Sequence, residues 1–94
     1  MSKFITFEGG EGTGKSTQVK LLAEALTKAD IDSVSTREPG GAPGAEDIRN
    51  LLVNGDVDRW SPMSEALLNY AARAEHLEHT VVPALESGKW VISD

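Results

Sequence analysis

The stretch that decides the fold is Gly9-Gly10-Glu11-Gly12-Thr13-Gly14-Lys15-Ser16-Thr17. It matches the pattern G-x-x-x-x-G-K-[ST], which is typical of loops that bind nucleotide phosphates. The glycines let the backbone turn so that successive amide N–H groups point inward and form an anion site. In such a loop Lys15 brings a positive charge to the β- and γ-phosphates, and the Ser16 hydroxyl is a ligand for Mg²⁺.

The residues on both sides of this loop have the pattern that the motif requires. Residues 3–8 read as a short buried strand. Residues 16–29 read as a helix, because their apolar side chains recur three and four positions apart. A strand, a glycine-rich loop and a helix in this order distinguish a phosphate site from a plain glycine-rich turn. We therefore predict a nucleotide-binding loop.

The length and composition of the chain exclude several classes of protein. The chain has 94 residues, a net charge of −6 and no cysteine. It is long enough for one small domain at most, and disulfides and thiolate metal sites are excluded. The acidic balance argues against binding polymeric DNA or RNA, which favours a basic face. No apolar run is long enough to cross a bilayer and no leader opens the chain, so we expect a cytoplasmic protein without a membrane partner.

The rest of the chain predicts two more strands and two more helices. The strands are expected at residues 33–37 and 89–94, and the helices at residues 45–53 and 61–86. Ser61 is the expected N-cap of the last helix, and Pro83 is expected to kink it. Its predicted apolar face consists of Met63, Ala66, Leu67, Tyr70, Ala71, Ala74, Leu77 and Val81. The long crossover between the first two strands predicts that they are parallel.

Polar segments follow the second and third predicted strands. Residues 38–44 are rich in proline and glycine and leave the carboxyl end of the second strand, where open α/β sheets bind ligands. Asp94 ends the third strand, where P-loop proteins place a carboxylate directed at Mg²⁺. A domain rarely ends on a central strand, and three strands make a small sheet. We therefore expect residues 1–94 to be the first half of a longer domain.

Four features together resemble bacterial thymidylate kinases, which transfer the γ-phosphoryl group of ATP to dTMP for dTTP synthesis. They are the phosphate loop, Arg-Glu-Pro-Gly-Gly at 37–41, the helical run at 67–76 and Val-Ile-Ser-Asp at 91–94. The resemblance covers the whole chain. It implies an α/β, P-loop nucleoside-monophosphate-kinase-like three-layer fold whose parallel sheet has the order 2-3-1-4-5. Only strands 1–3 would be present, without the lid and the C-terminal strands. It also implies Mg²⁺ as cofactor and a homodimer.

The resemblance also implies roles for individual residues. Those implied for ATP are Gly9, Gly10, Glu11, Gly12, Thr13, Gly14, Lys15, Ser16 and Thr17. Those implied for dTMP are Glu11, Arg37, Glu38, Pro39, Asn69, Tyr70 and Arg73. Among these, Arg37 would grip the acceptor phosphate and Arg73 would hydrogen-bond the thymine ring. Lys15, Arg37 and Asp94 would be catalytic, and Ser16 and Asp94 would hold Mg²⁺.

Two positions depart from the commonest family pattern. Asn69 stands where an aromatic usually stacks on thymine, so either Tyr70 replaces that contact, Asn69 makes a polar one, or the base lies differently. Gly12 stands where some members carry an arginine, which implies that a later lid segment supplies the cation.

Two functional alternatives stay open: a kinase with another nucleotide or nucleoside acceptor, and a truncated nucleotide-binding module without turnover. We expect the 94 residues alone to be inactive.

Several side chains also have purely structural interpretations. Tyr70 lies on the predicted apolar face and is interpreted as a core residue rather than a ligand contact. Arg73 could instead pair with Glu65 or Glu78 on its own helix. His76 and His79 have no partner at catalytic spacing and are interpreted as surface or interface residues. Glu11, Arg37 and Asp94 could be ordinary loop or strand-end charges, and Glu8 either points into the site or only closes the strand.

Overall fold

The computed structural model describes residues 2–9, 14–56 and 58–94 and confirms the α/β class. The elements are β1 (Phe4–Thr6), α1 (Lys15–Lys28), β2 (Ser33–Thr36), α2 (Pro43–Val53), α3 (Pro62–His76), the π-helical η1 (Leu77–Val81), α4 (Val82–Glu86) and β3 (Trp90–Ser93). They form two compact units. The sheet unit comprises Met1–Arg37 and Val81–Asp94, and the helical unit comprises Glu38–Thr80.

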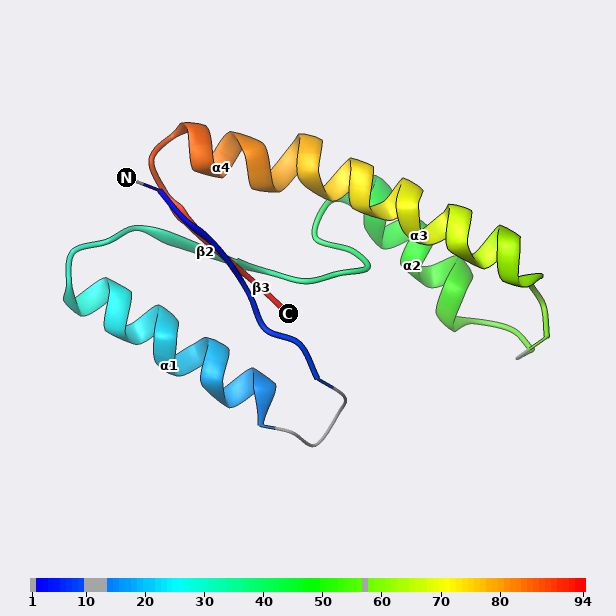
Figure 1. Cartoon of the computed structure of the whole chain (residues 1–94), viewed down its shortest axis with the longest axis horizontal. Coiled ribbons are helices and arrows are strands. Elements are labelled where there is room, and N and C mark those ends of the chain that lie inside the picture. The colour runs from blue at the N-terminus through cyan, green and yellow to red at the C-terminus, as the bar shows by residue number, and fades with distance from the viewer. Residues whose placement is uncertain (1, 10–13, 57) are drawn as a thin grey trace. The chain divides into compact units, whose positions relative to one another are not determined.

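The sheet unit is a three-stranded sheet in the order β1-β3-β2, with β3 parallel to both neighbours. This order agrees with the first part of the expected arrangement, and the predicted parallel direction is confirmed. Figure 1 shows α1 and α4 on opposite sides of the sheet. Since helices cover both faces, the central strand β3 is apolar and its Val91 and Ile92 are fully buried.

The first strand is shorter and more exposed than the sequence indicates. The prediction of a buried strand over residues 3–8 is wrong in both respects, because β1 spans only Phe4–Thr6 and Phe4 is 41% exposed. The physical reason is its place in the sheet. In this chain β1 has β3 as its hydrogen-bonded neighbour on one side only, so its side chains have fewer neighbours to pack against.

The described residues of the helical unit include α2, α3 and most of η1, and α2 packs on α3 through small side chains. The core of this unit consists of Ala42, Ala45 and Ala72, with Ile48 packed against them, and Figure 1 shows α2 and α3 side by side. Helix α2 starts at Pro43, two residues before the predicted position, because proline suits the first turn of a helix. The predicted start of α3 is confirmed: Ser61 is the N-cap and accepts a hydrogen bond from the Ser64 amide.

The predicted apolar face of α3 is not the face that packs within this unit. Met63, Leu67 and Tyr70 are exposed, whereas Ala72 and His76 are buried. The side chain that meets the alanines of α2 must be small, because two helices approach closely only through small residues. Hydrophobic periodicity alone therefore indicated the wrong stripe.

The long predicted helix is divided by a wider helical turn that lies before Pro83, and the kink expected at Pro83 itself stays a prediction. The π-helical η1 separates α3 from α4, and Pro83 lies in the first turn of α4. Proline has no N–H to donate to the preceding turn, and its ring crowds the carbonyl four residues earlier. None of the helices in the described ranges combines the length and the apolar character that a membrane span needs.

Candidate functional site

Residues that the sequence predicts to be functional follow each of the three strands. Because β1, β2 and β3 are parallel and in register, the residues after them share one edge of the sheet. Glu8 follows β1, Arg37 follows β2 and Asp94 follows β3. The Asp94 amide donates to the Thr36 carbonyl at 3.2 Å, which extends the strand pairing one step past the strands. The sheet unit thus brings Arg37 and Asp94 to one edge.

The described part of the phosphate loop ends at an open helix N-terminus. Gly14 adopts a left-handed conformation with φ of 79° and is the N-cap of α1, without a side-chain cap. The first N–H groups of a helix have no partner within the helix, so they are available to an anion. The Lys15 ammonium donates to the Gly9 carbonyl at 3.2 Å, and Ser16 and Thr17 are exposed in the first turn.

Four residues of the predicted ATP site lie outside the described residues. They are Gly10, Glu11, Gly12 and Thr13. Their predicted roles therefore stay predictions.

The oxygen donors of the sheet unit suit Mg²⁺ better than a transition metal. Mg²⁺ is bound by one or two protein oxygens together with substrate phosphates and water, and the Ser16 hydroxyl and the Asp94 carboxylate are donors of that kind. The described ranges contain no group of three or more histidine, cysteine or acidic side chains that could hold a metal by themselves. The chemistry of the Ser16 and Asp94 donors therefore fits Mg²⁺.

The helical unit contains a pocket of about 380 Å³. It is lined by Glu38, Pro39, Ala66, Asn69, Tyr70 and Arg73. All of these except Ala66 were predicted from the sequence as acceptor-site residues, so the structure brings five of them together. Ala66 was missed because it was assigned to the apolar face of its helix.

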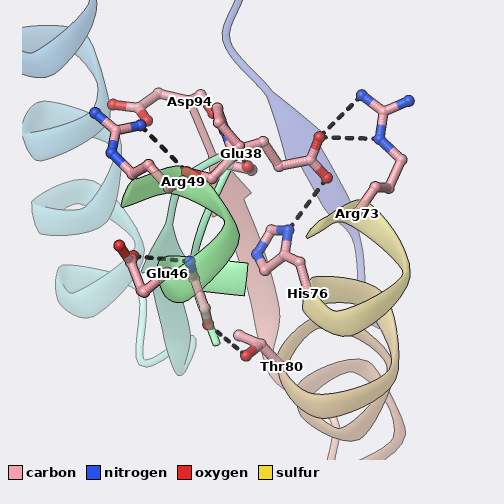
Figure 2. A network of polar contacts seen from close by, with 10 residues as sticks. Glu38, Glu46, Arg49, Arg73, His76, Thr80 and Asp94 are labelled. Carbon is pink, nitrogen blue, oxygen red and sulfur yellow. Dashed lines mark hydrogen bonds and ion pairs between the residues drawn. The ribbon is translucent and has the colours of Figure 1, made fainter. Parts of the chain in front are cut away.

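Arg73 is held on the pocket wall by Glu38 (Figure 2). The Arg73 Nε and Nη2 atoms donate to Glu38 Oε2 at 3.0 and 2.9 Å. The other carboxylate oxygen, Oε1, lies 3.1 Å from His76 Nδ1. Both Glu38 oxygens therefore have partners, and Arg73 pairs with this loop glutamate rather than with Glu65 or Glu78.

The same contacts set the ionisation of Glu38. Burial raises the pKa of Glu38, but the hydrogen bonds from His76 and Arg73 and the Arg73 charge together lower it more, so its pKa lies below the ordinary value of 4.5. Glu38 is consequently an anion at neutral pH. Its charge is balanced by the arginine of the pocket.

The two histidines of the C-terminal helical region behave differently. His79 is exposed, and its Nε2 lies 3.2 Å from Glu75 Oε2, which confirms the surface interpretation. The same interpretation of His76 is wrong, because its side chain is 0% exposed and contacts Glu38. Local spacing could not reveal this partner, which lies 38 residues earlier in the chain.

The structure shows which of the neighbouring residues Asn69 and Tyr70 places an aromatic ring at the pocket. Tyr70 is 68% exposed and lines the pocket, so the interpretation as a core residue is wrong. Asn69 donates its side-chain amide to the Glu65 carbonyl of its own helix at 3.0 Å. The aromatic ring on this wall is therefore that of Tyr70.

Three polar side chains that sequence analysis missed hold the Pro-Gly-Gly turn beside the pocket (Figure 2). The Glu46 carboxylate accepts from the Gly41 amide at 3.0 Å, and Arg49 donates to the Pro39 carbonyl at 3.2 Å. The Thr80 hydroxyl donates to the Gly41 carbonyl. The Glu38–Pro39 peptide bond is cis. Only the fold brings these groups to the turn.

Known proteins similar to this chain are thymidylate kinases. The family profile described as thymidylate kinase matches residues 7–94. Curated thymidylate kinases of Rhizorhabdus wittichii and Caulobacter vibrioides are each 59% identical to the chain, over 98% and 97% of its length and 44% of their own. A crystal structure of thymidylate kinase from Ehrlichia chaffeensis is 42% identical, with a TM-score of 0.87 over 100% of this chain and 54% of that one.

These matches cover nearly the whole chain but only part of each relative. The chain spans less than half the length of the curated relatives it matches. The match includes residues from both compact units, from Phe7, directly after β1, to Asp94. The chain belongs to the thymidylate kinase family.

Proposed function

We propose that the complete protein transfers the γ-phosphoryl group of ATP to dTMP, giving dTDP and ADP. The observation that carries this proposal is the pocket of the helical unit, in which Glu38 fixes the Arg73 guanidinium beside Tyr70. Membership of the thymidylate kinase family supports the same substrates.

The donor side of the reaction is assigned to the sheet unit. The uncapped N-terminus of α1 and the Lys15 ammonium provide the positive field that a triphosphate needs. Ser16 and Asp94 would hold Mg²⁺, which supplies charge neutralisation on the β- and γ-phosphates. Because the acceptor is itself a phosphate anion, positioning and electrostatic stabilisation supply most of the catalysis.

The acceptor side is assigned to Arg37 and the pocket. Arg37 would bind the dTMP phosphate, since a planar guanidinium can make two parallel bonds to it. Arg73 would bind the base. Glu38 uses two of the five N–H groups of this arginine, and the other three can face a ligand. An arginine can only donate, so it favours the carbonyl oxygen of thymine over the amino group that cytosine carries at the same position.

A panel of acceptors tests the reaction. The complete protein should phosphorylate dTMP with a higher kcat/KM than dCMP, AMP or thymidine, measured by coupled release of ADP. Equal rates with dCMP would contradict the assignment of the base pocket. Binding of ATP–Mg²⁺ in a calorimeter without any ADP release would instead support a nucleotide-binding module.

We also infer that the protein is a cytoplasmic homodimer without a nucleic-acid or membrane partner. The exposed Met63 and Leu67 side chains on α3 support an interface between copies, since exposed apolar groups gathered on one helix favour association. The net charge of −6 disfavours a nucleic-acid polymer. Sedimentation of the complete protein at micromolar concentration checks the dimer, and a strictly monomeric species would contradict it.

A further inference from the structure

Glu38 contacts a buried histidine, His76, to which the proposed reaction assigns no role. His76 is 0% exposed, Glu38 is 24% exposed and Arg73 is 59% exposed. The three side chains therefore form a chain of contacts that runs from the interior of the helical unit to the pocket (Figure 2). His76 and Arg73 approach different oxygens of the same carboxylate.

An exposed arginine needs such an anchor. A surface ion pair by itself is worth little, because two long side chains lose freedom when they hold one geometry. Glu38 differs from an ordinary surface glutamate, since one of its oxygens is bound to a side chain that packing has immobilised. The remaining oxygen then has a defined direction, and the Arg73 guanidinium takes its orientation from it.

The direction of the hydrogen bond follows from the chemistry of its partners. An ionised carboxylate has only acceptor sites, so His76 Nδ1 must carry the hydrogen that joins it to Glu38 Oε1. The contact therefore requires a donor at the position of Nδ1 on residue 76.

We propose that His76 is a positioning residue of the base pocket, which directs Arg73 at the ligand by fixing the Glu38 carboxylate. The inference rests on the proposed function in one respect: the group that Arg73 meets is taken to be the thymine ring. The role of His76 in orienting Arg73 is a property of the helical unit itself.

Two variants with amide side chains distinguish a positioning role of the His76 Nδ1–H donor from a role of the side chain in filling space. In His76→Asn the amide nitrogen can occupy the place of Nδ1, whereas in His76→Gln it can occupy the place of Nε2. His79→Gln is the matched control, because His79 is exposed and bound to Glu75. Thermal unfolding of all three proteins sets a working temperature at which each is folded.

The steady-state kinetics of the complete protein give the main readout. We expect His76→Gln to raise the KM for dTMP about tenfold, because a half-buried carboxylate oxygen loses its donor. The KM for ATP and the kcat at saturating dTMP should stay close to those of the wild type. His76→Asn should keep the KM for dTMP within about twofold, since the donor is restored. Equal effects of the two amides, or a rise in the KM for ATP as large as that for dTMP, would overturn the proposal.

A measurement without substrate keeps this inference separate from the proposed function. In ¹⁵N-labelled protein, the Arg73 Nε–H should exchange slowly in the wild type and in His76→Asn, and rapidly in His76→Gln. If the wild type fails to phosphorylate dTMP, the proposed function falls, and this exchange pattern still decides the role of His76.

The wild type also offers a test that needs no variant. The ¹⁵N shifts of the His76 ring should show that Nδ1 carries a hydrogen. A bare Nδ1 would overturn the proposal, even if the His76 variants fail to fold.

Discussion

At the scale of single residues, the two units carry different kinds of recognition. Lys15 and Arg37 belong to the sheet unit and are proposed to bind phosphates. Arg73 belongs to the helical unit and is oriented by a carboxylate on its own pocket wall. A phosphate is bound through charge-assisted hydrogen bonds, whereas selection of a base also needs donors that point in a fixed direction. We therefore expect substitution of Lys15 to affect the chemical step, and substitution of Arg37 or Arg73 to affect binding of the acceptor.

Removal of the Lys15 charge should affect the chemical step. We expect Lys15→Ala to lower kcat by about a hundredfold or more, because a preorganised cation near the transferred phosphoryl group is lost. Lys20→Ala, an exposed lysine farther along α1, is the control and should leave kcat unchanged. Steady-state ADP release measures both, and an unaltered kcat in Lys15→Ala would remove this residue from the reaction.

Removal of Arg37 should affect the acceptor more than the donor. We expect Arg37→Ala to raise the KM for dTMP by about tenfold or more, since a charge-assisted pair of bonds to phosphate is lost, while the KM for ATP changes little. Arg59→Ala is the control, because the Arg59 side chain is exposed and stacks on Trp60 at 5.1 Å. Proportional changes in both KM values would place Arg37 outside the acceptor site.

At the scale of elements, the Pro-Gly-Gly turn is shaped by its contacts with α2. Gly40 has φ of 133°, and a Cβ built on it would lie 2.6 Å from Glu46 Oε1. A side chain at position 40 would therefore strain the backbone and also displace the carboxylate that binds the Gly41 amide. The turn needs glycine for both reasons.

Substitution of Gly40 tests whether both backbone strain and the loss of the Glu46 contact destabilise the fold. We expect Gly40→Ala to lower the free energy of unfolding by about 2–4 kcal/mol, because backbone strain and a lost hydrogen bond add. Gly88→Ala is the matched control: Gly88 has φ of 86°, but nothing lies within 4 Å of its added Cβ, so only strain applies. Denaturant unfolding of both variants measures the difference. Equal losses would mean that the Glu46 contact contributes nothing.

At the scale of the whole molecule, Glu38 links the stability of the fold to pH. The pKa of Glu38 is lower in the folded chain than its ordinary value of 4.5. The ionised form is therefore favoured by folding, and this contribution is fully present above the unfolded pKa and is lost as pH falls through the folded pKa. The stabilising effect of Glu38 should thus begin to fall below about pH 4.5 and should be gone once the pH is below the folded pKa.

Comparison with Glu38→Gln isolates this contribution. The difference in free energy of unfolding between the wild type and the variant should be constant from neutral pH down to about pH 6 and should shrink below pH 4.5. Denaturant unfolding across this range measures it. A difference that grows as pH falls would contradict a lowered pKa.

The sequence by itself determined the class of fold and most of the candidate site. The loop from Gly9 to Thr17, the strand signals and the Arg-Glu-Pro-Gly-Gly run are local patterns, and local patterns follow from backbone sterics and short-range hydrogen bonding. They predicted a parallel α/β fold and carried the resemblance to the family. That resemblance in turn implied five residues that the structure gathers in one pocket: Glu38, Pro39, Asn69, Tyr70 and Arg73.

Only the tertiary structure decided which side of α3 is buried and which partners the charged residues choose. Hydrophobic periodicity favoured the stripe with Met63 and Tyr70, but close approach of α2 required the small Ala72 instead. His76 is also buried on this helix and contacts Glu38, which lies 38 residues earlier in the chain. Such contacts depend on how helices pack, and packing is a property of side-chain shape across the whole unit that no local pattern encodes.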